Sequence, residues 1–180
     1  RSLVGSEMCI RDRLMGVQNP AGKLVETFPL SLEDVPCTPF FPGENRQMQY
    51  REGIYVGYRY YDTARRDVLF PFGHGLSYTE FEYVEANTDN ASLTADGSIT
   101  LNVTLKNTGN RAGAEVIQVY RHTRNSATHQ PDQQLCGFAK VLLQSAQAAT
   151  VTITLAAENF RTFDHGTNNW VLEAGTIQLR

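Results

Sequence analysis

Isolated carboxylates are the first side chains in this sequence that could do chemistry. Hydrolysis by paired carboxylates needs two such groups facing one bond. The acidic residues here mostly stand alone in expected turns or at strand edges, and Glu52, next to Gly53, is the most attractive candidate. A solvated residue at the start of a strand is the simpler interpretation of Glu52, and we prefer it.

Histidines are the second candidates for a site. His74 lies between two glycines, and no His or Cys lies nearby in the sequence as a partner, so a hydrogen-bonded structural role is favoured over a ligand or a base. His122 and His129 flank a polar loop and could form a weak metal site. Two imidazoles without a third ligand do not define one, so we predict no metal-binding residue.

Aromatic side chains are the third candidates, because their faces can stack on sugar rings. Four tyrosines form a stripe: Tyr55, Tyr58, Tyr60 and Tyr61. Packing of a strand between two domains explains this stripe at least as well. The single tryptophan, Trp170, presents the same choice, and a place in the core or at the rim of a sandwich is preferred.

The cellular compartment is not determined by the sequence. Cys9, Cys37 and Cys136 match no zinc or redox spacing, and an odd number implies no disulfide framework. Two triplets, starting at Asn90 and Asn102, match the N-glycosylation pattern, which matters only in a eukaryotic secretory protein.

Composition excludes two classes of partner. The formal net charge of −3 over 180 residues gives no electrostatic footprint for nucleic acid or an anionic membrane. No apolar run is long enough to cross a bilayer. We therefore expect neither a nucleic-acid nor a membrane partner.

The elements that must position these side chains are mainly strands, and residues 101–120 organise them. Ile99, Leu101, Val103 and Leu105 alternate with polar residues, which predicts a strand with one apolar face. Asn and Gly in residues 107–110 predict a turn.

The following strand, residues 115–120, is apolar on both faces: Ile117 and Val119 lie on one, Val116 and Tyr120 on the other. One face should pack in its own core and the other against something else, such as another domain.

The second half of the chain has the pattern of a mainly β fold. Expected strands are residues 81–86, 98–107, 114–121, 135–143, 149–155, 169–173 and 176–179, with one helical turn at 158–160. Short strands separated by polar turns predict a β-sandwich of the immunoglobulin or fibronectin type III kind. Val151, Ile153 and Leu155 should point inward with Ile99, Leu101 and Val103.

The first half is less regular. Residues 14–16 could end a helix, 19–22 and 42–45 fit turns, 23–28 and 50–62 have strand character, 31–41 suggest an extended crossing, and 68–78 suggest a non-helical connector. Residues 1–13 show neither the helical nor the strand period of apolar residues, and they do not have the pattern of a signal peptide. They resemble translated adapter sequence, and we expect them to pack against nothing.

Five motifs together resemble one protein family. They are NPAGKLVETFP from Asn19, YREGIYVGYRYYD from Tyr50, PFGHGLSYTEFEY from Pro71, LKNTGNRAGAEVIQVY from Leu105 and LCGFAKVLL from Leu135. Their order and spacing are similar to the C-terminal end of glycoside hydrolase family 3, closest to its β-glucosidases, and the similarity covers nearly all of residues 14–180.

The resemblance implies a domain layout. In that family a TIM-like barrel carries an aspartate nucleophile, an α/β sandwich domain carries the acid/base glutamate, and a fibronectin type III-like domain follows. Residues 14–78 would be the tail of the α/β sandwich domain with its linker. Residues 79–180 would be the fibronectin type III-like domain, ending within its last strand.

The resemblance also implies that the catalytic residues lie outside this chain. The barrel is missing, and the acid/base segment lies upstream of Asn19; Ser6 and Glu7 mimic it only superficially. We expect no catalytic, cofactor-binding or metal-binding residue here, and no cofactor.

The leading hypothesis is a non-catalytic fragment of a retaining β-glucosidase, whose partners are a β-glucoside substrate and the missing domains. The alternatives are a stand-alone fibronectin type III-like carbohydrate-binding or adhesion module, and a β-xylosidase of the same family.

Overall fold

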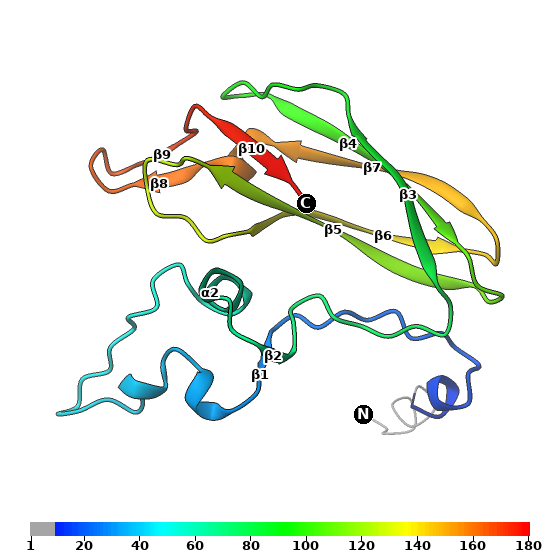
Figure 1. Cartoon of the computed structure of the whole chain (residues 1–180), viewed down its shortest axis with the longest axis horizontal. Helices are drawn as coiled ribbons and strands as arrows, with labels where there is room; N and C mark the ends of the chain where they lie inside the picture. The colour runs from blue at the N-terminus through cyan, green and yellow to red at the C-terminus, as the bar shows by residue number, and fades with distance from the viewer. Residues whose placement is uncertain (1–9) are drawn as a thin grey trace, which may run out of the picture. The chain divides into compact units, whose positions relative to one another are not determined.

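The computed structural model describes residues 10–180 (Figure 1). By their contacts, these residues divide into two compact units. Unit 1 comprises the described residues up to Gly22, then Gly75–Gln118 and Gly137–Asn159. Unit 2 comprises Lys23–His74, Val119–Cys136 and Phe160–Arg180. The domain boundaries that the sequence suggested, 14–78 and 79–180, stay a prediction.

Strands dominate the described residues. One sheet has the order β3 (Phe81–Thr88), β4 (Ser98–Asn107), β7 (Ala148–Ala156), and another has the order β10 (Thr176–Leu179), β5 (Gly113–Arg124), β6 (Gln134–Leu143). Two small ribbons pair β1 (Phe28–Pro29) with β2 (Val68–Phe70) and β8 (Thr162–Asp164) with β9 (Asn169–Val171). After a helical stretch at residues 10–14, the helical elements are α2 (Tyr58–Ala64) and the 3₁₀ turns η1 (Leu32–Asp34), η2 (Thr38–Phe40) and η3 (Ala157–Phe160).

The alternating pattern of β4 becomes the core of unit 1. β4 lies between β3 and β7 and pairs antiparallel with both. Leu101 lies opposite Ile153, and both are buried together with Val103 and Leu155. These inward positions are confirmed, whereas Ile99 and Val151 are only half-buried.

A second layer completes the core of unit 1. Leu105, Leu143 and Leu155, from three strands, have no exposed surface. On β6, Gly137 lies so close to β7 that an added Cβ would be 2.5 Å from Leu155 Cδ2. This close approach explains the glycine, and the predicted β-sandwich is confirmed.

The turn after β4 is held by a buried side chain. Asn107 is 0% exposed, and its Oδ1 accepts hydrogen bonds from Thr79 Oγ1 at 2.6 Å and from the Gly109 N–H at 3.0 Å. Its Nδ2 donates to the Arg111 carbonyl at 2.7 Å. β4 and β5 lie in different sheets, so this turn carries the chain between sheets.

Most predicted strands of the second half are confirmed. Residues 98–107 and 176–179 match β4 and β10, and the other boundaries differ by a few residues. η3 confirms the helical turn. The strand β8 was missed, because Phe163 is its single apolar residue and one such residue cannot show a period.

The strand expected in residues 50–62 is wrong, because residues 58–64 form helix α2. Gly57 has φ of 55°, a left-handed conformation that glycine adopts easily, and its carbonyl accepts the first helical bonds. The helix places Tyr58, Tyr61 and Asp62 on one face. Tyr61 is 5% exposed, so tertiary burial overrides β propensity here.

Four smaller expectations also need correction. The strand at 23–28 is reduced to Phe28 in β1, and residues 31–41 hold η1 and η2 rather than an extended crossing. The turn expected at 42–45 lies at 44–47. Residues 19–22 form no turn, because the Asn19 side chain instead binds Ser77 Oγ and the Tyr78 N–H.

The first nine residues, including Ser6, Glu7 and Cys9, lie outside the described residues. Residues 10–14 are helical, and the chain leaves the helix at Gly16 as expected. Ile10 is 60% exposed. The expectation that residues 1–13 pack against nothing is wrong at Arg13, whose carbonyl accepts a 2.6 Å hydrogen bond from the Tyr78 hydroxyl.

Candidate functional site

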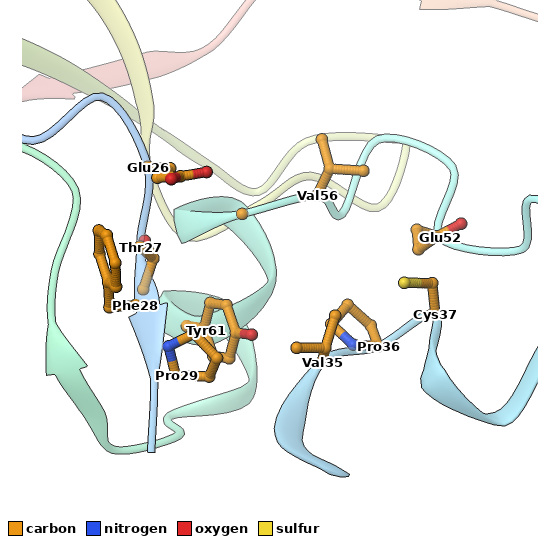
Figure 2. A pocket seen from close by; sticks show the side chains of 11 residues that line it. Glu26, Thr27, Phe28, Pro29, Val35, Pro36, Cys37, Glu52, Val56 and Tyr61 are labelled. Atoms are coloured by element: carbon orange, nitrogen blue, oxygen red, sulfur yellow. The ribbon is translucent and has the colours of Figure 1, made fainter. Parts of the chain in front are cut away.

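A pocket in unit 2 contains Glu52, the carboxylate that sequence reasoning singled out. It has a volume of about 360 Å³ and is lined by Glu26, Thr27, Phe28, Pro29, Val35, Pro36, Cys37, Glu52, Val56, Gly57 and Tyr61 (Figure 2). The wall comes from β1 and the two residues before it, from the segment between η1 and η2, and from α2 with the chain leading into it. Residues about 30 positions apart therefore meet here.

The pocket is mainly apolar with polar groups at its edges. Figure 2 shows the Tyr61 side chain beside Pro29, and the Glu26 carboxylate on the same side as Val56. Burial raises the pKa of Tyr61 most, and the negative charge of Asp34 raises it further. The Tyr61 hydroxyl therefore stays protonated and can donate a hydrogen bond. Such a pocket can hold a small molecule with an apolar body and hydroxyl or amine groups.

The pocket's residues do not form a metal site. Among residues 10–180, no group of three or more His, Cys, Asp or Glu side chains is arranged to hold a metal ion. Within the same range, no helix is long and apolar enough to cross a membrane.

His74 has structural contacts. Its ring stacks on Phe70 with centroids 5.2 Å apart, and its carbonyl accepts a 2.8 Å hydrogen bond from the Leu24 N–H. These contacts join the connector after β2 to the segment before β1. They agree with the structural role that we preferred for His74.

His122 and His129 have different partners. His122 Nδ1 lies 2.5 Å from the Asp132 carbonyl oxygen and 3.5 Å from Asp132 Oδ1. The His129 ring packs against Tyr55, with centroids 5.6 Å apart. Each imidazole therefore supports a part of the loop between β5 and β6.

The tyrosine stripe is packed rather than available for stacking on a ligand. Tyr58 stacks on Phe72 at 4.8 Å and meets Tyr120 edge-on at 5.8 Å. Burial raises the pKa of Tyr120 to about 12. The second apolar face of β5 is thus covered at Tyr120 by α2, and packing explains Tyr58 and Tyr61.

A polar cluster around Asp132 was missed by sequence reasoning. Thr63 Oγ1 accepts a 2.9 Å hydrogen bond from the Asp132 N–H, and Gln133 Nε2 donates to Asp62 Oδ2 at 2.8 Å. Arg180 Nη1 lies 2.9 Å from Asp132 Oδ2. Since these partners are about 50 to 70 positions apart in sequence, no local pattern could identify the cluster.

Arg121 was also missed by sequence reasoning, although the alternation of apolar residues along its strand already indicated an inward position. It continues the inward alternation of Ile117 and Val119, is 6% exposed, and donates to the Phe160 and Arg161 carbonyls. Burial lowers the pKa of its guanidinium. Its role is structural, because it satisfies backbone acceptors at the end of η3.

Trp170 is not a core residue. It is 61% exposed on β9. Of the two glycosylation triplets, Asn90 is exposed, whereas Asn102 lies half-buried on β4 and accepts a 2.8 Å hydrogen bond from Thr152.

Comparisons with known proteins agree with this architecture. A model of the fibronectin type III-like domain matches residues 115–180. Thermostable β-glucosidase B of Acetivibrio thermocellus is 43% identical over 170 residues, and the match covers 94% of this chain and 22% of that protein. β-Glucosidase BoGH3A of Bacteroides ovatus is 40% identical, with 97% and 24% covered.

One similar protein has a different named activity. An exo-α-(1→6)-L-arabinopyranosidase of Bifidobacterium breve is 38% identical, with 94% of this chain and 22% of that protein covered.

Solved structures give the same result. The β-glucosidase DesR of Streptomyces venezuelae superposes with a TM-score of 0.87 at 37% identity, covering 94% of this chain and 22% of that one. A GH3 β-glucosidase of Bifidobacterium adolescentis superposes with a TM-score of 0.87 at 36% identity, with 94% and 25% covered. The chain spans about a fifth to a quarter of the length of these proteins. It therefore resembles the C-terminal part of glycoside hydrolase family 3 of the β-glucosidase type, including the fibronectin type III-like domain of that part.

Proposed function

We propose that this chain is the non-catalytic C-terminal part of an enzyme that hydrolyses terminal β-D-glucosyl residues by a retaining two-carboxylate mechanism. One observation carries the proposal: the match covers 94% of this chain but 22% of a β-glucosidase. The barrel and most of the α/β sandwich domain of such an enzyme would lie in the remainder.

The carboxylates of this chain have other roles in the proposal. A retaining mechanism needs two carboxyl groups about 5 Å apart on either side of the bond. Burial, and to a lesser degree the Asp132 charge, raise the pKa of Asp62, but each carboxylate is held by a partner: Gln133 donates to Asp62, and Arg180 donates to Asp132. They fasten the loop to α2, so the nucleophile and the acid/base are assigned to the missing domains.

The missing domains are the proposed partners of the first half of the chain. Many large apolar side chains of this half are exposed, among them Leu14, Met15, Val25, Leu32, Phe41 and Tyr50. We assign residues 14–78 to the tail and linker of the α/β sandwich domain and residues 79–180 to the fibronectin type III-like domain. In that assignment, the exposed side chains pack against the rest of the enzyme.

The first experiment tests whether the chain lacks catalysis. The purified chain is incubated with an aryl β-glucoside beside its Glu52→Gln and Glu26→Gln variants. We expect no turnover above a buffer control in all three. Turnover that disappears in either variant would show a catalytic carboxylate in the pocket and would overturn the proposal.

The second experiment tests the parent activity with a chimera. Residues 14–180 replace the matching C-terminal part of Acetivibrio thermocellus β-glucosidase B. We expect an active, soluble chimera, with the unmodified enzyme as the positive control and the same enzyme truncated at the junction as the negative control. A folded chimera with no more activity than the truncated enzyme would contradict the assignment.

Sugar specificity belongs to the missing domains in this proposal. The similar protein of B. breve is named as an arabinopyranosidase. The second candidate function is therefore a glycosidase that acts on another sugar. The complete parent protein, assayed with aryl β-glucoside, β-xyloside and α-L-arabinopyranoside, should favour the glucoside. A preference for the xyloside would support the β-xylosidase alternative instead.

A further inference from the structure

The hairpin formed by β8 and β9 presents an aromatic surface outside the core of unit 2. In the antiparallel register Phe163 lies opposite Trp170, so the two side chains share one face of the ribbon. Their rings meet edge to face, with centroids 5.5 Å apart. Phe163 in turn contacts His165 at 5.1 Å, so the three rings form a continuous group.

Trp170 is held in place and yet open to solvent. It is 61% exposed although it is the largest apolar side chain in the sequence. The contact with Phe163 restricts the indole, which lowers the entropy that a ligand would have to remove on binding. In contrast, Tyr58 and Tyr61 of α2 are covered by their own neighbours.

The turn of the hairpin is polar and has its own hydrogen bonds. Asp164 accepts hydrogen bonds from the Gly166 N–H at 2.9 Å and from Thr167 Oγ1 at 2.7 Å. Asn168 has φ of 53°, in the left-handed region that Asn tolerates. The exposed His165 and Asn168 therefore offer hydrogen-bonding groups close in sequence to the indole on a preformed turn.

We propose that this hairpin is an accessory saccharide-binding surface, with Trp170 as its stacking platform. The hydroxyl groups of a β-glucopyranose are all equatorial, so its C–H groups line both flat faces of the ring. Such a face suits an exposed indole, whose π surface is electron-rich. His165 and Asn168 supply hydrogen bonds to hydroxyl groups at the ring edge. The choice of a β-linked glucan as ligand rests on the proposed function.

Binding is weak for a short ligand, because one open platform buries little surface. We expect a dissociation constant of about 1 mM for an oligosaccharide. A long glucan repeats the same ring many times, so retention in a polysaccharide matrix is the more sensitive readout.

The first test uses Trp170 as its own probe, since it is the single tryptophan of the sequence. The chain is titrated with cellopentaose, and its tryptophan emission is recorded, with maltopentaose as the α-linked control. We expect a saturating change with cellopentaose and a smaller one with maltopentaose. No change at about ten times the expected dissociation constant would overturn the proposal.

The second test compares variants by native electrophoresis in gels with and without barley β-glucan. The chain and its Phe138→Ala variant, which loses an aromatic side chain that is 69% exposed on β6, should be retarded by the glucan. Trp170→Ala should lose the retardation, and Trp170→Phe should keep part of it. Unfolding curves check that each variant is folded.

Two results of this test would overturn the proposal: no retardation of the chain itself, or equal retardation of Trp170→Ala. The outcome is independent of catalysis. If the chimera described above is inactive while retardation depends on Trp170, the proposed function fails and the saccharide surface stands. If the chimera is active without retardation, this inference alone fails.

Discussion

Unit 1 and the first segment of unit 2, residues 23–74, bury their apolar side chains to different extents. In unit 1, Leu105, Leu143 and Leu155 have no exposed surface. In residues 23–74, Tyr61 is the one apolar side chain that is buried, while Val25 is 86% exposed. Long paired strands close a core, whereas a seven-residue helix and strands of two or three residues bury too little surface to do so.

The two regions also differ in the interactions that stabilise them. Apolar burial dominates unit 1, while α2 in unit 2 is fastened to distant segments by side-chain hydrogen bonds. The Tyr58 hydroxyl accepts a 2.8 Å bond from the Leu135 N–H, and Thr63 accepts one from Asp132. Because a hydrogen bond contributes less net stability than a buried leucine, substitutions should have larger effects in unit 1.

The largest effect should follow loss of a buried leucine in unit 1. Leu105→Ala should lower the free energy of unfolding by about 3 kcal/mol, since it removes a buried side chain and leaves a cavity. Leu32→Ala, at a side chain 71% exposed in unit 2, should change it by less than about 0.5 kcal/mol. Urea unfolding measures both, and equal losses would contradict the comparison.

A smaller effect should follow overpacking between the layers of unit 1. Gly137→Ala places a methyl group 2.5 Å from Leu155 Cδ2, and the strain should cost about 2 kcal/mol. Gly22→Ala is the matched control, because nothing lies within 4 Å of its new Cβ. A shift in the unfolding midpoint for Gly22→Ala as large as that for Gly137→Ala would argue against strain.

In unit 2, removal of one hydroxyl should loosen α2. Tyr58→Phe keeps the ring on Phe72 but removes the acceptor for the Leu135 N–H, at a cost of about 1 kcal/mol. Amide hydrogen exchange at Leu135 should become faster, while Tyr50→Phe, at a side chain 82% exposed, should leave it unchanged. Unchanged exchange in Tyr58→Phe would mean that the bond does not hold the helix.

The smallest effect should be a pH dependence of folding stability that arises from Asp62. Burial, and to a lesser degree the Asp132 charge, raise the pKa of this carboxyl above its ordinary value of 3.8, against the opposing hydrogen bond from Gln133. The folded state therefore binds the proton more tightly than the unfolded state does, and this contribution to stability is lost as pH rises through the raised pKa.

Asp62→Asn tests this sign, because it removes the charge and keeps an acceptor for Gln133. The variant should be more stable than the parent chain at neutral pH. The difference in unfolding midpoint should shrink as pH falls toward 3.8 and below. A difference that is constant over this range would rule out titration of Asp62 as its cause.

Much of unit 1 was predictable from the sequence. The alternation in residues 98–107 gave the bounds of β4, and Leu101, Val103 and Ile153 point inward as expected. The candidate site was less predictable. Glu52 was identified as the carboxylate of interest, but its meeting with Glu26 and Tyr61 in one pocket depends on how the chain folds back on itself.

The sequence by itself determined the strands of the sandwich, because a period of two places neighbouring side chains on opposite faces whatever the distant partners are. Tertiary structure alone decided that residues 58–64, which are rich in β-forming tyrosines, form a helix, whose Tyr58 ring stacks on Phe72 and meets Tyr120 edge-on. It also decided that Trp170 is exposed and that Arg121 is buried. These outcomes depend on contacts between residues tens of positions apart, and local propensity is too weak to decide against such contacts.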